Sequence, residues 1–185
     1  MKQNLSIYNK EYYKRDISEY WLSKHNLLRP DQLAAVCYTF GINPFNGEAH
    51  YREPGLIYSI GCGAGDLENT LEKMGYKVVG VDPSHEAQEL YKGDKIISKY
   101  TGGGDTIIFC ESIEHIPHEE IKRIMDLIPK EARVIIVNWP DFHPIPATDD
   151  EHITEIDDVF LDRLSDGRRV VFRRESHLVL EGDRK

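Results

Sequence analysis

The chain has 185 residues, of which 40% are hydrophobic and 30% charged, and its formal net charge is −9. This length suits one domain with a sizeable core, and the composition excludes a mainly disordered chain. No apolar run approaches the ~20 residues of a membrane span, and the N-terminus lacks the apolar core of a signal peptide, so we expect a cytoplasmic protein. The acidic balance argues against a broad electrostatic grip on nucleic acid.

Two helical segments are expected first. Residues 10–28 place aromatic and aliphatic side chains at roughly helical spacing. A second helix is predicted to begin at Pro30 and to end before Gly41, because proline favours the first turn of a helix and glycine the position after its end. We expect residues 1–54 to form a helical cover over a core of residues 55–185, within a single domain.

From residue 55 onward, short apolar runs alternate with charged amphipathic segments, which predicts a parallel sheet covered by helices on both faces. The expected strands are 56–60, 76–81, 95–98, 106–110 and 133–138, and the expected helices are 66–74, 84–91, 118–128 and 157–164. The segments RRVVFRR and SHLVLEG then follow with almost no room for a crossover, so they should pair antiparallel at one sheet edge. The predicted fold class is α/β, Rossmann-like and doubly wound.

The segment IYSIGCGAGDLE contains the clearest local signal. A buried strand leads into Gly61, Gly63 and Gly65, and a helix follows at once. Glycine permits a tight turn and close approach of a ligand, and the helix start offers unpaired N–H groups. The next strand ends at Asp82, where an acid accepts hydrogen bonds from ribose hydroxyls. These features predict an adenosine-binding site. The less favoured alternative is a plain turn, with Asp82 as a helix cap.

The GxGxG spacing resembles motif I of the class I S-adenosylmethionine-dependent methyltransferases, and VVGVDPS and DTIIFCESIEHIP are similar to their second and fourth-strand motifs. The resemblance implies a mostly parallel seven-stranded sheet whose last strand is antiparallel. It also implies a cofactor site for S-adenosylmethionine, formed by Gly61, Cys62, Gly63, Gly65, Asp82, Pro83 and Glu111. One departure is Ser59, which stands where the family usually has an acid that helps to hold the methionine amino group.

Glu111, Glu114 and His115 follow the fourth strand in CESIEHIP. If the backbone turns helically there, they share one face, and their oxygens and imidazole suit Mg²⁺ or Mn²⁺. His143 and His152 are candidates for a fourth ligand, and we favour His152 because the loop around it must fold back over the site. The alternative needs no metal: Glu114 orients His115, which acts as a general base.

An ExxEH motif with a later histidine is similar to two methyltransferase families, the metal-dependent O-methyltransferases of ubiquinone biosynthesis and the small-RNA 3′-terminal ribose 2′-O-methyltransferases. The resemblance implies that a bound cation lowers the pKa of a hydroxyl, whose oxyanion then attacks the sulfonium methyl group. We predict a methyltransferase that acts on the hydroxyl of a small molecule. The net charge of −9 disfavours an RNA acceptor. A non-catalytic S-adenosylmethionine-binding accessory protein is the third interpretation, since Ser59 and the short third strand leave room for it.

Overall fold

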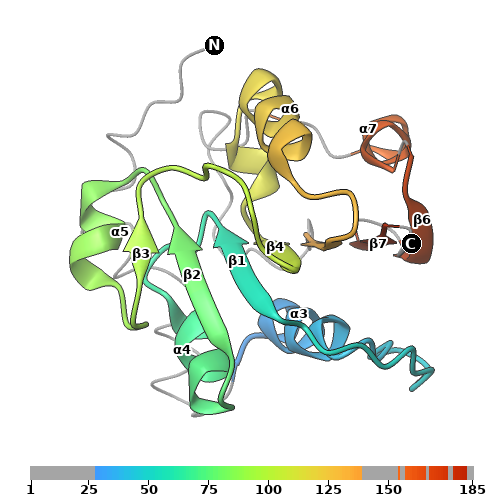
Figure 1. Cartoon of the computed structure of the whole chain (residues 1–185), viewed down its shortest axis with the longest axis horizontal. Coiled ribbons are helices and arrows are strands. Elements are labelled where there is room, and N and C mark those ends of the chain that lie inside the picture. Colours follow the sequence, from blue (N-terminus) through green and yellow to red (C-terminus); the bar gives the residue numbers. More distant parts are fainter. Residues whose placement is uncertain (1–27, 139–153, 155–156, 166, 175–176, 183–185) are drawn as a thin grey trace.

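The computed structural model describes residues 28–138, 154, 157–165, 167–174 and 177–182. In these ranges the strands form one sheet, and the helices pack against it (Figure 1). None of the helices described there combines the length and the hydropathy that crossing a bilayer demands.

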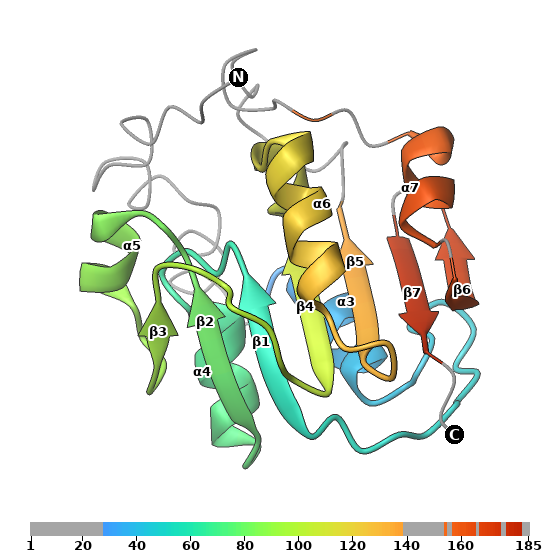
Figure 2. The same ribbon diagram turned by 45° about the horizontal axis from the view of Figure 1, so that its top comes forward.

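Seven strands form one sheet in the order β3-β2-β1-β4-β5-β7-β6 (Figure 2). From β3 to β5 all neighbouring strands pair parallel, whereas β7 pairs antiparallel with both β5 and β6. The strands are β1 (Leu56–Ile60), β2 (Lys77–Val81), β3 (Ile96–Ile97), β4 (Thr106–Cys110), β5 (Arg133–Val137), β6 (Arg169–Arg174) and β7 (His177–Glu181).

The predicted fold class is confirmed, including the antiparallel pair at one edge. Strands β1 and β4 have the predicted bounds, whereas β3 consists of only two residues. The last strand in the chain, β7, lies between β5 and β6, so β6 forms the sheet edge. The connection between β6 and β7 is short, which permits only this antiparallel arrangement.

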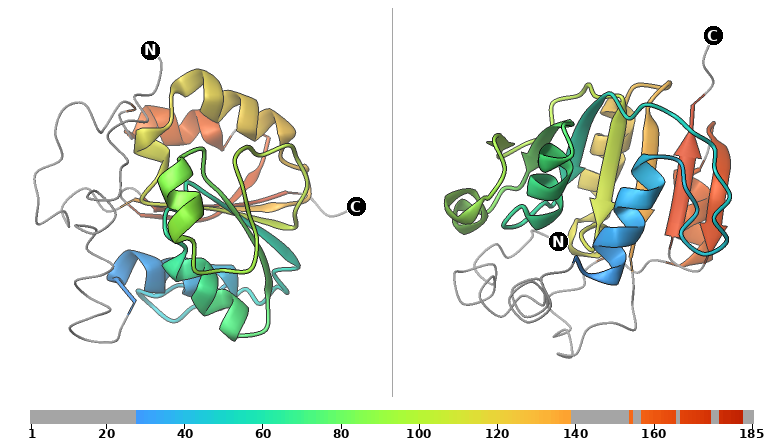
Figure 3. Two further views of the ribbon diagram at one scale, coloured as in Figure 1. Left: turned by 90° about the vertical axis from the view of Figure 1, so that its left-hand side faces the viewer. Right: turned by 90° about the horizontal axis from the view of Figure 1, so that it is seen from below.

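Helices cover both faces of the sheet, as the left view of Figure 3 shows. On one face α3 and α4 pack against β1, β4 and β5, and on the other α6 and α7 do so. The helices are α3 (Pro30–Thr39), α4 (Asp66–Lys73), α5 (His85–Leu90), α6 (His118–Leu127) and α7 (Asp158–Leu164), with a short 3₁₀ helix η2 (Ile113–His115) after β4. The predicted helix at residues 10–28 lies almost wholly outside the described residues.

Strand β4 shows why the central strands are mostly apolar. Ile108 points into the core beneath α3 and α4, whereas Ile107 and Phe109 point into the core beneath α6 and α7. All three side chains are 0% exposed. Because successive residues of a strand face opposite sides, a strand covered on both faces needs apolar residues pointing both ways.

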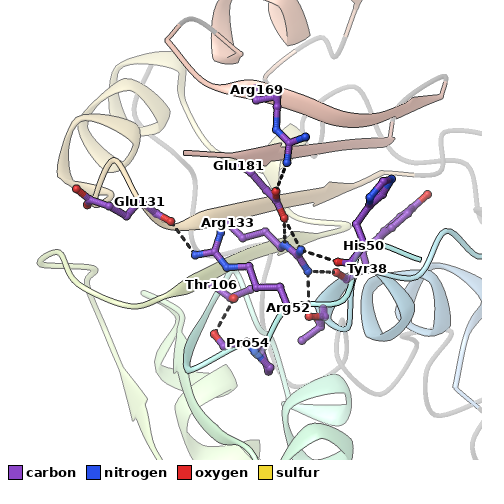
Figure 4. A network of polar contacts seen from close by, with 10 residues as sticks. Tyr38, His50, Arg52, Pro54, Thr106, Glu131, Arg133, Arg169 and Glu181 are labelled. Carbon is purple, nitrogen blue, oxygen red and sulfur yellow. Dashed lines mark hydrogen bonds and ion pairs between the residues drawn. The ribbon is translucent and has the colours of Figure 1, made fainter. Parts of the chain in front are cut away.

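The segment after α3 is fixed to the sheet by one buried cation, Arg133 (Figure 4). Its guanidinium is paired with Glu181 of β7. It also donates hydrogen bonds to the backbone carbonyls of Tyr38 at 3.0 Å and His50 at 3.3 Å. Because Arg133 is 0% exposed, these bonds replace its hydration, and they hold residues 38–50 against β5.

The functional end of the sheet lies where β1 and β4 are neighbours. The chain moves from β1 to β2 and β3 on one side, and then returns to β4 and β5 on the other. The strand order therefore reverses between β1 and β4, and open α/β sheets bind their ligands outside the carboxyl ends of the strands at such a point. Both predicted functional segments, the glycine loop and the ExxEH motif, follow these two strands.

Candidate cofactor and catalytic site

The glycine loop has the strand–loop–helix geometry that the sequence predicts. Gly61, Gly63 and Gly65 have φ angles of 70°, 54° and 82°, in the left-handed region that favours glycine. A Cβ added at Gly61 would lie 2.5 Å from the Cβ of Ser112, so the loop after β1 and the segment after β4 approach too closely for a side chain. Gly65 is the residue before α4 and provides no side-chain cap for its N–H groups.

Asp82 links the glycine loop to the start of α5. One carboxylate oxygen accepts a hydrogen bond from the N–H of Gly63 at 3.0 Å, and the other accepts one from the N–H of Ser84 at 2.9 Å. Asp82 is 7% exposed, and burial raises the pKa of its carboxyl. Each carboxylate oxygen can accept a second hydrogen bond, so the two backbone contacts leave acceptor capacity for a ligand.

Cys62 and Pro83 are the other two residues that the resemblance assigns to the cofactor site in these segments. Cys62 lies inside the glycine loop, and burial raises the pKa of its thiol well above the usual range, so the thiol is neutral. Pro83 is exposed, between Asp82 and α5. Neither residue has the chemistry of a nucleophile here, which agrees with a binding role for the loop.

Glu111 begins the segment after β4 with an unusual backbone. Its φ is 50°, and among the described residues it is the only non-glycine residue with positive φ. Its N–H donates to the carbonyl of Val137 at 2.9 Å, and the next hydroxyl, that of Ser112, donates to the carbonyl of Ile60 at 2.7 Å. These bonds tie the ends of β1, β4 and β5 together and hold Glu111 in a conformation that L-residues rarely adopt.

Glu114 and His115 form a buried pair within η2. Their side chains approach to 3.7 Å between Oε1 and Nε2, and the residues are only 3% and 9% exposed. Within the described ranges, neither carboxylate oxygen of Glu114 has a hydrogen-bond partner. Burial, and then the charge of Glu111, raise the pKa of Glu114 to about 8. A carboxyl with this pKa can exchange protons near neutral pH.

The chain after β5 returns over this pair. The N–H of Thr154 donates to the carbonyl of Glu114 at 3.0 Å, and its hydroxyl donates to the carbonyl of Ile116 at 2.7 Å. Thr154 is 2% exposed. The expected return of this loop over the site is therefore seen at Thr154, whereas His143 and His152 themselves lie outside the described residues.

The described residues do not assemble the predicted metal ligands. No group of three or more His, Cys, Asp or Glu side chains in the part of the chain with defined placement is arranged to hold a metal ion. The helical turn that would bring Glu111 onto the face of Glu114 and His115 begins only at Ile113, after the positive φ of Glu111. A metal at this motif remains a prediction, and no catalytic step is derived from it.

Sequence reasoning missed a second buried carboxylate, Glu68 of α4, which is 1% exposed and is a hydrogen-bond partner of Ser59. It also missed Asp31, which accepts a weak bond from the Cys110 thiol at 3.6 Å. A signal for Glu68 was available. Around the helix axis it lies about 60° from Leu71, which is buried together with Leu67, so its side chain falls at the border of the covered face.

The fold and the glycine loop define a class I S-adenosylmethionine-dependent methyltransferase domain. A family described as "Methyltransferase domain" matches residues 46–173, and the chain belongs to this family.

Two solved structures share the fold at low sequence identity. TehB from Haemophilus influenzae has a TM-score of 0.56 at 12% identity, covering 91% of this chain and 67% of that one. A SAM dependent methyltransferase from Archaeoglobus fulgidus has a TM-score of 0.53 at 15% identity, covering 81% of this chain and 74% of that one.

A curated relative matches a shorter stretch more strongly. It is the ubiquinone biosynthesis O-methyltransferase of Agrobacterium fabrum (strain C58 / ATCC 33970), which is 42% identical over 67 residues. The match covers 35% of this chain and 26% of the relative, so this chain matches about a quarter of the relative's length.

Proposed function

We propose that the chain is an S-adenosylmethionine-dependent O-methyltransferase whose acceptor is a hydroxyl group of a small molecule. The observation that supports this most is Glu114, a buried carboxylate without hydrogen-bond partners in the described structure, 3.7 Å from His115 in the segment after β4, the strand next to β1 and its glycine loop. A hydroxyl is a poor nucleophile until its proton is removed, and a buried pair of this kind removes protons. The match to an O-methyltransferase supports the same acceptor atom.

The residues present fit the cofactor. S-adenosylmethionine would supply a methyl group activated by a positively charged sulfur. The glycine loop admits a ligand close to its backbone, and Asp82 has acceptor capacity left for the ribose hydroxyls. The cofactor contacts proposed for Cys62, Pro83 and Glu111 follow from their positions in the same three segments.

The pair Glu114–His115 would accept the proton. As the new C–O bond forms and the C–S bond breaks, the hydroxyl proton passes to His115, and the neighbouring carboxylate of Glu114 holds the ring and stabilises its positive charge. Both side chains are almost fully buried, which strengthens this interaction because little water screens it. Ionised Glu114 is the active form, so turnover should rise as pH increases through about 8.

A methyl-transfer assay tests the proposal. The full chain is incubated with methyl-labelled S-adenosylmethionine and a panel of phenols and catechols, and Glu114→Gln, His115→Asn and the exposed-site control Glu119→Gln are compared. We expect the first two variants to lower kcat by roughly 100-fold, and to lose the rise with pH, while the control keeps both. Cofactor binding without turnover on any acceptor would contradict the proposal and favour the accessory protein.

Two further arms of the assay address the finer predictions. Metal assistance is measured by dialysing the protein against EDTA and then adding Mg²⁺ or Mn²⁺. Turnover that depends on the metal would mean that Glu114 and His115 act as metal ligands and not as the proton acceptor. A short single-stranded RNA in the acceptor panel measures the RNA alternative. Methylation of the RNA in preference to every small hydroxyl would overturn the small-molecule assignment.

A further inference from the structure

Glu68 is a buried acid, and one of its two carboxylate oxygens accepts no hydrogen bond from the described residues. It lies in α4 and is 1% exposed, yet its Oε2 atom has no hydrogen-bond partner within the described ranges. Its side-chain partner is the hydroxyl of Ser59, itself 2% exposed. Burial raises the pKa of Glu68 to about 7. An enclosed carboxylate is costly unless a cation or several donors face it.

The carboxylate of Glu68 is buried near the glycine loop, because its charge raises the pKa of the Cys62 thiol in that loop. Its charge influences the thiols of Cys62 in that loop and Cys110 at the end of β4, and the phenol of Tyr91 after α5. These three groups belong to different elements around the carboxyl ends of β1, β2 and β4. Glu68 therefore lies on the side of α4 that faces the sheet, against Ser59 of β1, and not on the solvent side of its helix.

The described charges that most affect Glu68 are negative. Asp66 and Glu72 of the same helix both raise its pKa. The cation beside Asp66 is Lys92, whose Nζ lies 2.8 Å from the Oδ1 atom of that acid. The chemical complement of Glu68 is thus a buried group with positive charge and N–H donors, which the methionine end of the cofactor has in its α-ammonium group.

We propose that Glu68 binds this ammonium group, supplying from α4 the carboxylate that β1 lacks at Ser59. The hydrogen-bond contact between the two side chains means that an acid at either position would place its carboxylate in the same small volume. The inference deepens the proposed function and rests on it. The competing interpretation is structural: Glu68 stays protonated and only bonds Ser59.

Calorimetric titration with two probes separates these interpretations. S-adenosylhomocysteine contains the ammonium group, whereas 5′-methylthioadenosine has the same nucleoside and sulfur without the amino acid. We expect Glu68→Gln to weaken S-adenosylhomocysteine binding about 10- to 100-fold and to leave 5′-methylthioadenosine binding unchanged. The matched control is Glu72→Gln, which keeps an oxygen acceptor for the N–H of Asp94 and should change neither affinity.

The number of protons released on binding S-adenosylhomocysteine also separates the two interpretations, because a purely structural Glu68 would release none. If an ammonium group ionises Glu68, the wild-type protein releases protons near pH 7 on binding S-adenosylhomocysteine, as titrations in buffers of different ionisation enthalpy reveal. The other ionisable groups near Glu68 are Asp66, Glu72, Cys62, Cys110 and Tyr91, and all of them remain in the Gln variant. The release should disappear in Glu68→Gln.

A relocation variant completes the test and does not depend on the folding of Glu68→Gln. Glu68→Leu alone should bind S-adenosylhomocysteine weakly, and adding Ser59→Asp should restore its affinity to within about fivefold of wild type, because the carboxylate returns to β1. Equal losses for both probes, or no loss for either, would overturn the role of Glu68. Wild-type protein that binds neither probe would instead overturn the proposed function.

Discussion

Replacing Glu114 with Gln should stabilise the ligand-free protein at alkaline pH. Burial, and then the charge of Glu111, raise the pKa of this carboxyl from 4.5 to about 8. A carboxyl with a raised pKa binds more protons in the folded than in the unfolded chain. The free energy of unfolding therefore falls as pH rises from about 4.5 to about 8. Glutamine resembles the protonated carboxyl and has no such penalty.

The size of the effect follows from the two pKa values. Each tenfold difference in ionisation constant corresponds to about 1.4 kcal/mol, so ionising Glu114 in the folded chain costs at most about 5 kcal/mol. Part of this cost is already present at pH 5, because that value lies above the unfolded pKa. Between pH 5 and pH 8 we expect the wild type to lose on the order of 3 kcal/mol of stability relative to Glu114→Gln.

Urea unfolding at pH 5, 6, 7 and 8 measures this difference. The wild type, Glu114→Gln and the exposed control Glu119→Gln are unfolded in parallel, and the free energies in water are compared. The control should follow the wild type at every pH. If the wild type and Glu114→Gln also give parallel pH profiles, Glu114 is solvated or paired in solution, and the reasoning that makes it a base near neutral pH is refuted.

Three other perturbations test the remaining parts of the site and the fold. Asp82→Asn should weaken S-adenosylhomocysteine binding roughly tenfold in calorimetry, because an amide nitrogen cannot accept the bonds that a carboxylate oxygen accepts. Arg133→Met should lower the free energy of unfolding by about 3 kcal/mol in urea, since it leaves several backbone carbonyls without their donor and Glu181 with Arg169 as its remaining arginine partner. Gly61→Ala should lower the melting temperature more than Gly47→Ala. Both glycines have φ near 70°, but only at Gly61 would the added Cβ meet Ser112, at 2.5 Å.

The sheet could be predicted from the sequence because its central strands are buried on both faces. A run such as TIIFC has no charged residue and three consecutive large apolar ones, which separates it from the amphipathic segments beside it. The glycine loop is predictable because the backbone at Gly61, Gly63 and Gly65 has the left-handed φ that favours glycine. Both features are local, and each depends on residues that are close in the sequence.

The features that could not be predicted depend on tertiary neighbours. The position of β7 between β5 and β6 is one example, because the apolar pattern does not specify which strand lies at the edge. The positive φ of Glu111 is another, since it requires the bonds that join the ends of β1, β4 and β5. The alignment of Glu111 with Glu114 and His115 was predicted from a helical turn that includes Glu111. The turn begins only at Ile113, because Glu111 has a positive φ.

Three buried acids in the segments around the glycine loop favour a sulfonium compound over a dinucleotide as the ligand of that loop. Asp82, Glu68 and Glu114 are each less than 10% exposed, and burial raises the pKa of all three carboxyls. A pyrophosphate would bring two more negative charges to this set and would raise the cost of ionising each acid further. A ligand with an ammonium and a sulfonium has the opposite effect, because it stabilises the ionised carboxylates that the ligand-free protein holds at a cost.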